Sequence, residues 1–251
     1  MPREWDATTY DALPLPHLEW GRRTLDRLSL SGDERVLDLG CGTGRDTVAL
    51  LDRLPGGRVV ALDGSLRMLD QLRARLDGRP DRDRVDITHA DITRPPLPVR
   101  GLVDAVTSVA TFHWIPDHAA LFAGVAAVLR PGGAFVAECG GLGNIASVSA
   151  AVDDVLGPQP AVWNFAGTEE TERRLHDAGF TDVRVALLPD PARLEPGDQL
   201  LSYLAVVVLG GQLERLPADR HEAFVRAVAD RLPEPVVDYV RLTISATRAL
   251  G

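Results

Sequence analysis

Apolar positions along this chain form short continuous runs and, between them, segments with helical spacing. The continuous runs predict strands at 35–39, 59–62, 85–89, 103–109, 134–138 and 181–188. Apolar residues that recur every three or four positions predict helices at 45–54, 65–76, 117–129 and 168–178, and Ser65 is a suitable N-cap for the second of them. This alternation favours a doubly wound α/β fold, in which helices cover both faces of a mostly parallel sheet.

The two ends of the chain depart from that alternation. Further helices are predicted at 11–30, 198–209 and 217–232, and a last strand at 235–246. No strand is predicted between the helices at 198–209 and 217–232. This pattern predicts that the two helices are an insertion before the last strand of the sheet. We therefore expect a single domain over 1–251, with a helical cover at 1–30 and a helical lid at 189–235, before the last strand.

Composition narrows the class of protein. The 251 residues are 45% apolar and 25% charged, the balance of a soluble globular domain. All 27 basic residues are arginine, and 36 acidic residues give a net charge of −9, which argues against nucleic acid or an anionic membrane as partner. The apolar run Leu204–Gly211 is shorter than the ~20 residues of a membrane span. Cys41 and Cys139 have no metal-ligand spacing, so we expect a cytoplasmic protein with no metal.

The strongest local motif is the glycine-rich loop in the segment Val36–Gly44, read VLDLGCGTG, which follows the first strand and opens a helix. Glycines there permit positive φ and a close approach of the backbone to a ligand. A dinucleotide loop has the spacing G-x-G-x-x-G, but Arg45 stands where its third glycine belongs. Asp38, two residues before Gly40, is awkward beside a pyrophosphate and suits a ligand that carries an ammonium group. S-adenosylmethionine has such a group and no phosphate.

Two further acids end the next two strands. Asp63 closes the second strand, where a carboxylate can accept both ribose hydroxyls of a nucleotide. Asp91 follows the third strand, where it can accept from an adenine amino group. Each acid alone is typical of a solvated turn, but with Asp38 they place three carboxylates at the carboxyl ends of the first three strands.

These motifs, with the turn Leu129–Gly133, resemble class I S-adenosylmethionine-dependent methyltransferases over residues 34–139. The segment Val109–His118 is also similar to the trans-aconitate methyltransferase group. The resemblance implies a seven-stranded sheet whose last strand is antiparallel, and S-adenosylmethionine as cofactor. It implies that Asp63 binds ribose, that Asp91 faces adenine and that the glycine loop lies under the methionine part. The full set of candidate cofactor contacts is Tyr10, Asp38, Gly40, Cys41, Gly42, Asp63, Met68, Asp91, Ile92 and Val109.

The residues after the fourth strand are candidates for the chemistry. Methyl transfer is an in-line displacement in which the protein mainly aligns and desolvates the reactants. His113 could act as a general base, or it could only pack against the cofactor or orient the substrate. Trp114 could form a pocket wall or attract the sulfonium. Trp163, Tyr203 and Arg241 are further candidate substrate contacts; Arg241 could bind an acidic substrate or pair with a neighbouring acid such as Asp238.

Three functions remain open on these residues. The first is methyl transfer to a small-molecule acceptor, at a carboxylate or hydroxyl oxygen or else at nitrogen or carbon. The second is a catalyst or binding protein that holds S-adenosylmethionine without transferring its methyl group. The third is a nicotinamide-dependent oxidoreductase, against which the loop spacing counts. Neither the acceptor nor the oligomeric state follows from the sequence.

Overall fold

The structure, a computed structural model, describes residues 4–12 and 16–250. Its main sheet has seven strands among these residues, in the order β3-β2-β1-β4-β5-β9-β6. The strands are β1 (Arg35–Leu39), β2 (Arg58–Asp63), β3 (Val85–His89), β4 (Val103–Val109), β5 (Leu129–Gly140), β6 (Phe180–Pro189) and β9 (Val240–Arg248). Strands β1 to β5 pair in parallel, and β9 is antiparallel to both β5 and β6. The predicted seven-stranded sheet with an antiparallel last strand is confirmed.

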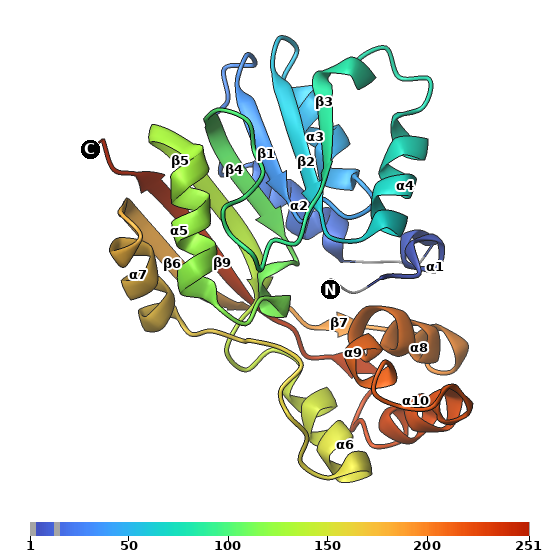
Figure 1. Cartoon of the computed structure of the whole chain (residues 1–251). Coiled ribbons are helices and arrows are strands. Elements are labelled where there is room, and N and C mark those ends of the chain that lie inside the picture. The colour runs from blue at the N-terminus through green and yellow to red at the C-terminus, as the bar shows by residue number, and fades with distance from the viewer. Residues whose placement is uncertain (1–3, 13–15, 251) are drawn as a thin grey trace.

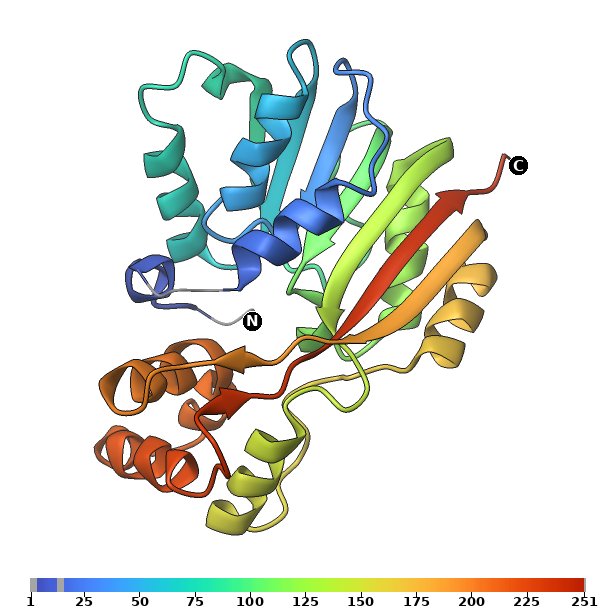
Figure 2. The same ribbon diagram turned by 180° about the vertical axis from the view of Figure 1, so that it is seen from behind.

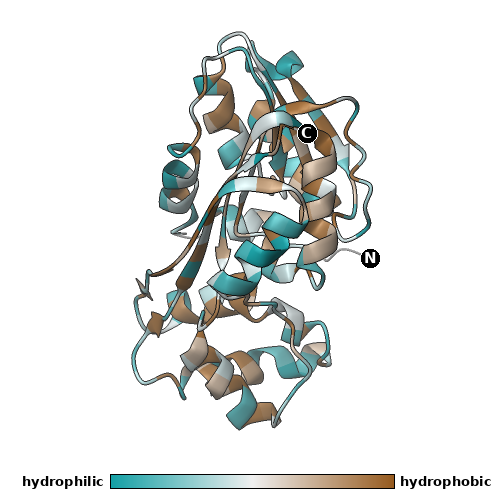
Figure 3. Cartoon of the chain, turned by 90° about the vertical axis from the view of Figure 1, so that its left-hand side faces the viewer, coloured by the Kyte–Doolittle hydropathy of each residue, from teal (hydrophilic) through white to brown (hydrophobic). Residues whose placement is uncertain are grey.

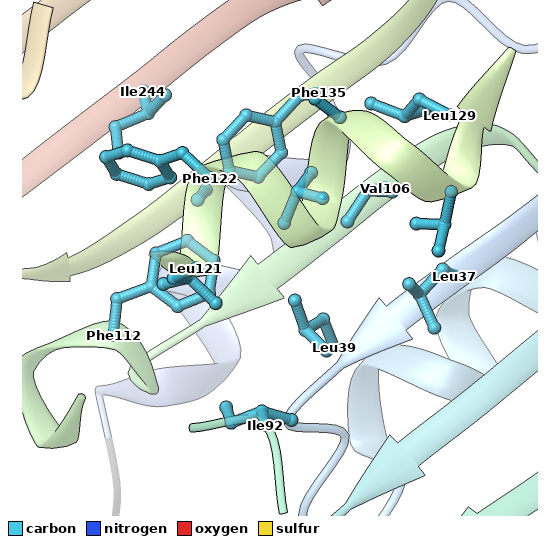
Figure 4. Close-up of a cluster of buried hydrophobic side chains, with 14 of the residues drawn as sticks. Leu37, Leu39, Ile92, Val106, Phe112, Leu121, Phe122, Leu129, Phe135 and Ile244 are labelled. Carbon is cyan, nitrogen blue, oxygen red and sulfur yellow. The ribbon is translucent and has the colours of Figure 1, made fainter. Parts of the chain in front are cut away.

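Helices cover both faces of this sheet (Figures 1 and 2). They are α2 (His17–Leu25), α3 (Arg45–Arg53) and α4 (Leu66–Leu76) on one face, and α5 (His118–Val128) and α7 (Thr168–Asp177) on the other. Side chains alternate along each strand, so Leu37 and Leu39 pack with α5 whereas Val36 packs with α2 and α3. Figure 4 shows Phe122 of α5 close to Phe112 and Phe135 in this core.

The predicted helix over 11–30 is two helices in the structure. They are α1 (Ala7–Ala12) and α2, and residues 13–15 between them lie outside the described residues. The prediction for α4 is confirmed in detail, because the Ser65 hydroxyl accepts a hydrogen bond from the Met68 amide and caps the helix. This cap also fixes the chain direction directly after β2, where the candidate site begins.

A group of helices beyond the strand ends forms a second layer, at the bottom of Figure 1. It contains α6 (Ala146–Leu156), α8 (Asp198–Tyr203), a π-helical turn (Leu204–Val208), α9 (Gly210–Leu213) and α10 (His221–Ala229). A two-stranded ribbon, β7 (Ala192–Arg193) and β8 (Val236–Val237), joins this group to β6 and β9. Short 3-10 turns lie at Arg82–Arg84, Phe112–Trp114 and Ala218–Arg220.

The helical group differs from the sequence prediction in two respects. Helix α6 lies outside the expected insertion at 189–235, yet it packs with α8 and α10 in one hydrophobic cluster. The predicted helix 198–209 is interrupted by the π-helical turn, where the β-branched run Val206–Val208 disfavours regular helix. In Figure 3, hydrophobic and hydrophilic residues alternate around these helices, as expected for elements that bury one face. None of the helices within residues 4–12 and 16–250 has the length and apolar character that a bilayer span requires.

Candidate functional site

A cavity of about 510 Å³ lies between the carboxyl ends of the sheet strands and the helical group. This volume falls within the ~300–1,000 Å³ of small-molecule sites. The strand ends, the N-terminal segment, the residues after β4 and β5, and the π-helical turn all contribute to its lining. The cavity thus occupies the crevice where ligands bind in open α/β folds.

The glycine loop forms one edge of the cavity. Gly40 and Gly42 both have positive φ, at 79° and 53°, and the Gly40 amide donates a hydrogen bond to the Leu62 carbonyl at 2.8 Å. A Cβ atom added at Gly42 would meet nothing within 4 Å, because that side of the loop is open space. The absence of a side chain at Gly42 therefore leaves room for a ligand directly over the backbone.

Asp63 is oriented toward this loop by the backbone. Its carboxylate accepts hydrogen bonds from the Gly42 amide at 2.9 Å and the Ser65 amide at 2.8 Å. Burial raises the pKa of Asp63, and these backbone donors oppose the rise. Two amides hold both carboxylate oxygens in place, and each oxygen retains a lone pair for a ligand hydroxyl.

Asp91 lies on the same side of the cavity, next to an apolar surface. It accepts hydrogen bonds from the Thr93 amide at 3.0 Å and the Thr93 hydroxyl at 2.6 Å. Burial opposes ionisation of Asp91, but these hydrogen bonds outweigh it and lower its pKa. Met68 and Ile92, both buried, line the cavity nearby and could contact the faces of a flat heterocycle.

Three predicted site residues do not line the cavity. Asp38 is buried beneath the loop and accepts a hydrogen bond from the Thr47 hydroxyl of α3 at 2.6 Å. Burial raises the pKa of Asp38 to about 8. The Cys41 side chain is buried within the loop. Tyr203 lies behind the wall, where its hydroxyl is 2.9 Å from that of Tyr239.

All the other predicted residues line the cavity: Tyr10, Gly40, Gly42, Asp63, Met68, Asp91, Ile92, Val109, His113, Trp114, Trp163 and Arg241.

Arg241, near the start of β9, is a buried cation in the cavity wall. Its side chain is 1% exposed, and its guanidinium carbon lies 3.7 Å from the centre of the Trp20 ring. Nε lies 3.5 Å from Oε1 of buried Glu138, but neither Nε nor Nη2 has a hydrogen-bond partner among the described residues. Asp238, the alternative partner, accepts hydrogen bonds from the amide and hydroxyl of Ser147 instead. Arg241 thus lines the cavity, and the acid that lies beside it is Glu138 instead of Asp238.

The carboxylate nearest to Arg241 is already engaged by two other arginines. Glu138 accepts from Arg23 at 2.5 and 3.0 Å and lies 3.6 Å from Nη1 of Arg27. Arg23 also donates to Asp190 at 2.7 Å. Arg23 and Arg27 thus share with Arg241 the carboxylate nearest to it, and Nη2 of Arg241 is left without a hydrogen-bond partner among the described residues. Although burial lowers the pKa of Arg241, an arginine side chain stays protonated in proteins. The cluster is suited to receive one anion.

His113 presents a hydrogen-bond donor to the cavity. The Gly140 amide donates to its Nδ1 at 3.2 Å, and because an amide can only donate, Nδ1 is unprotonated. Burial, followed by the charge of Arg241, lowers the pKa of His113 well below its usual value. The ring is therefore neutral, with its proton on Nε2. This arrangement favours an orienting role over the general-base role, since the free ring position carries a proton and the unprotonated one is occupied.

Aromatic rings form the wall beside His113. The Trp163 and Phe165 rings stack, with centroids 5.7 Å apart and planes 13° apart. The centroid of the Trp114 ring lies 6.5 Å from that of Trp163 and 5.2 Å from that of His113. Trp5 of the N-terminal segment meets Trp114 edge-on at 5.3 Å. These contacts make a continuous aromatic wall on one side of the cavity, in which only the Trp163 and Phe165 rings are parallel.

The N-terminal segment is held across the cavity mouth by two carboxylates. Glu4 accepts a hydrogen bond from the Ser65 hydroxyl at 2.8 Å. Asp11 of α1 accepts from Arg45 at 2.9 Å and from Arg75 at 2.5 Å. Tyr10 and Trp5 from this segment line the cavity. Within the expected cover at 1–30, residues 4–12 are thus anchored beside the cavity, and residues 1–3 and 13–15 lie outside the described residues.

Several lining residues escape prediction from sequence. Tyr239 contacts the Trp20 ring at 5.0 Å and lies two positions before Arg241, a spacing that could have flagged it. Ala110 and Ile145 both line the cavity with positive φ, at 56° and 49°. Non-glycine residues in this conformation cost ~1–3 kcal/mol each and concentrate at functional sites. No local sequence signal marks them. No group of three or more possible metal ligands gathers among the described residues.

Comparisons with known proteins agree with this geometry. Residues 36–133 match a family described as a methyltransferase domain. Trans-aconitate 2-methyltransferase of Acidovorax sp. strain JS42 is 33% identical over 135 residues, which are 54% of this chain and 49% of that protein. The chain thus matches about half the length of this relative. An uncharacterised methyltransferase of Schizosaccharomyces pombe is 30% identical over 202 residues, 72% of each chain. A phosphoethanolamine N-methyltransferase of Haemonchus contortus, solved with S-adenosyl-L-methionine, shares the fold with a TM-score of 0.65 at 17% identity, over 97% of this chain and 56% of that one.

The sheet order, the glycine loop and these similarities together define a methyltransferase fold. The chain belongs to the family of class I S-adenosylmethionine-dependent methyltransferases. This decides the cofactor class in favour of S-adenosylmethionine over a nicotinamide dinucleotide. The cavity fits that molecule chemically: open space over Gly42, a fixed carboxylate at Asp63 for ribose, and Asp91 beside an apolar surface for adenine.

Proposed function

We propose that this protein transfers the methyl group of S-adenosylmethionine to a carboxylate oxygen of a small-molecule acid. The observation that carries this proposal is the buried guanidinium of Arg241, which has an unpartnered Nη2 and shares its nearest carboxylate, Glu138, with Arg23 and Arg27. A buried charge is costly unless it is paired, so the wall is complete only with an anion against it. A carboxylate matches a guanidinium in charge and in planar geometry.

The residues around the cavity suit a carboxylate acceptor because such an acceptor brings its own nucleophile. A carboxylic acid is ionised at neutral pH, so no side chain has to remove a proton from it. His113, neutral and protonated at Nε2, can donate to a carboxylate oxygen and orient it. When bound, S-adenosylmethionine supplies the methyl carbon: the carboxylate oxygen bonds to it as the carbon–sulfur bond breaks, and that electron pair stays on sulfur. The aromatic wall and the N-terminal segment keep water away from this exchange.

The names of the relatives support an acid as acceptor. Several relatives at 32–38% identity are named trans-aconitate 2-methyltransferase, and trans-aconitate is a carboxylic acid. Each match spans at most half of the relative, so the likeness supports the cofactor half of the site more directly than the acceptor half.

The test pairs each acid with its neutral amide. Purified protein is incubated with S-adenosylmethionine and a panel of small acids or their amides, and S-adenosylhomocysteine and methyl ester are measured together. We expect equal amounts of both products from at least one acid and neither product from its amide. Conversion of an acceptor without S-adenosylhomocysteine would instead establish the non-methylating catalyst, and methylation of a hydroxyl would refute the carboxylate assignment.

A further inference from the structure

We call the part of the cavity around Arg241, His113 and Trp163 the acceptor region. The charges and rings there narrow the class of acid that could be the acceptor. Arginines that line the cavity among the described residues are Arg94, Arg215 and Arg241. Arg94 has a side chain that is 78% exposed and pairs with Asp91 at 3.3 Å, on the cofactor side. Arg215 is exposed at the lid rim, where it donates to the Pro160 carbonyl at 2.9 Å. Arg241 is thus the single buried cation among the described lining residues.

The groups that surround Arg241 add no second positive charge inside the cavity. Burial lowers the pKa of both His17 and His113, and the charge of Arg241 lowers them further, so both rings are neutral. Asp63 and Asp91 contribute negative charge on the cofactor side, and Glu214 is a third acidic residue in the cavity lining. One acceptor carboxylate can therefore be paired at depth, whereas a second or third would be buried without a partner at a cost of several kcal/mol each.

Much of the remaining acceptor region is aromatic or aliphatic, with Asn144 and Glu214 as further polar residues in the cavity lining. The stacked Trp163 and Phe165 rings and the His113 ring form one side. Val207 and Val208 of the π-helical turn line it from the lid. Flat rings pack best against another planar group, in offset-stacked or edge-to-face contact.

We propose that the acceptor is a monocarboxylic acid with a planar, apolar body, aromatic or conjugated, and not a tricarboxylate. The carboxylate lies against Arg241, and the planar body packs between the aromatic wall and the π-helical turn. This inference rests on the proposed function, because it names the acceptor class for that reaction. It also predicts that the chain differs in specificity from its trans-aconitate relatives, although its cofactor half resembles theirs.

The experiment measures binding and turnover separately. Protein loaded with S-adenosylhomocysteine is titrated calorimetrically with trans-cinnamate, a planar monoacid, and with trans-aconitate, a triacid, and turnover of both is followed as methyl ester. The variants are Arg241→Gln, Trp163→Ala and, as a matched charge control, Arg130→Gln. Arg130 lies at the opposite end of β5 and pairs with Asp104. Thermal melting identifies any variant that fails to fold.

We expect trans-cinnamate to bind at least tenfold more tightly than trans-aconitate and to be methylated. Arg241→Gln should weaken cinnamate binding by at least tenfold and leave the affinity for S-adenosylhomocysteine within about twofold, because its partner is the acceptor. Trp163→Ala should weaken cinnamate severalfold, and Arg130→Gln should change neither ligand.

Three results would overturn the inference, and they differ in whether they also refute the proposed function. Equal or tighter binding of trans-aconitate, with methyl ester formed, would refute the monoacid assignment and leave carboxylate methylation intact. Loss of S-adenosylhomocysteine affinity in Arg241→Gln, with cinnamate binding unchanged, would assign Arg241 to the carboxylate of the cofactor. Methylation of neither acid, together with methylation of cinnamyl alcohol, would refute the proposed function as well.

Discussion

The protonation state of His113 can be tested with two substitutions. They separate the effect of its Nε2 hydrogen-bond donor from the effect of its planar ring. His113→Phe keeps a planar ring but removes the Nε2 proton, whereas His113→Gln keeps an N–H donor and cannot titrate. Because Gly140 occupies Nδ1 and the ring is neutral, the function to be lost is one hydrogen bond to a charged acceptor. Such a bond contributes ~1.5–3 kcal/mol, which corresponds to about 10- to 150-fold in rate.

The assay is kcat/KM for the acceptor across about pH 5.5 to 9, with the Kd for S-adenosylmethionine measured in parallel. We expect His113→Phe to lose about 10- to 150-fold in kcat/KM, His113→Gln to lose much less, and both to bind the cofactor normally. The pKa of His113 lies well below its usual value, so wild-type activity should be level through the neutral range. A limb of the pH profile near neutrality that disappears in both variants, with equal losses in both, would show that His113 is a general base.

Three other substitutions, and a fourth as a control, test the cofactor side and the fold. Asp63→Ala should weaken S-adenosylmethionine binding by ~1.5–3 kcal/mol, the range for charged hydrogen bonds, and an unchanged Kd in calorimetry would remove Asp63 from the ribose site. Asp11→Asn should raise the same Kd severalfold by loosening the N-terminal segment, whereas Asp70→Asn, which changes an exposed ion pair on α4, should not; equal effects would argue against a cover. Asp38 has a raised pKa, so the folded state keeps a proton that the unfolded chain loses between about pH 4 and 8, and this group's contribution to stability falls as pH rises. Asp38→Asn should therefore gain stability relative to wild type from pH 5 to 8 in urea unfolding, and a constant difference would contradict the raised pKa.

Much of the cofactor side follows from local sequence. A parallel strand ends at the crevice, so Asp63 and Asp91 share one edge of the sheet wherever the intervening helices run. Glycines with positive φ are visible in the same way. Asp38 shows the limit of this reasoning, because a residue within the strand points to one face or the other, and here it points to Thr47 of α3 instead of the cavity.

The acceptor side depends on contacts between distant segments. Arg241 meets Trp20 across 221 positions of sequence, and Glu138 organises arginines from α2 and β9 together. Helix α6 joins the helical group from outside the predicted insertion because its apolar face packs with α8 and α10. Local periodicity cannot reveal such pairings. The sequence therefore predicts Tyr203 as a substrate contact, whereas its hydroxyl lies behind the cavity wall, against that of Tyr239.

The distribution of tryptophan has a practical consequence for this protein. Its sequence contains four tryptophans, and Trp5, Trp20, Trp114 and Trp163 all line the cavity. Indole emission from this chain therefore originates wholly at the site, with no background from elsewhere in the fold. An unlabelled acid that enters the cavity changes the surroundings of these indoles directly, so the native protein is its own fluorescent sensor for the acceptor.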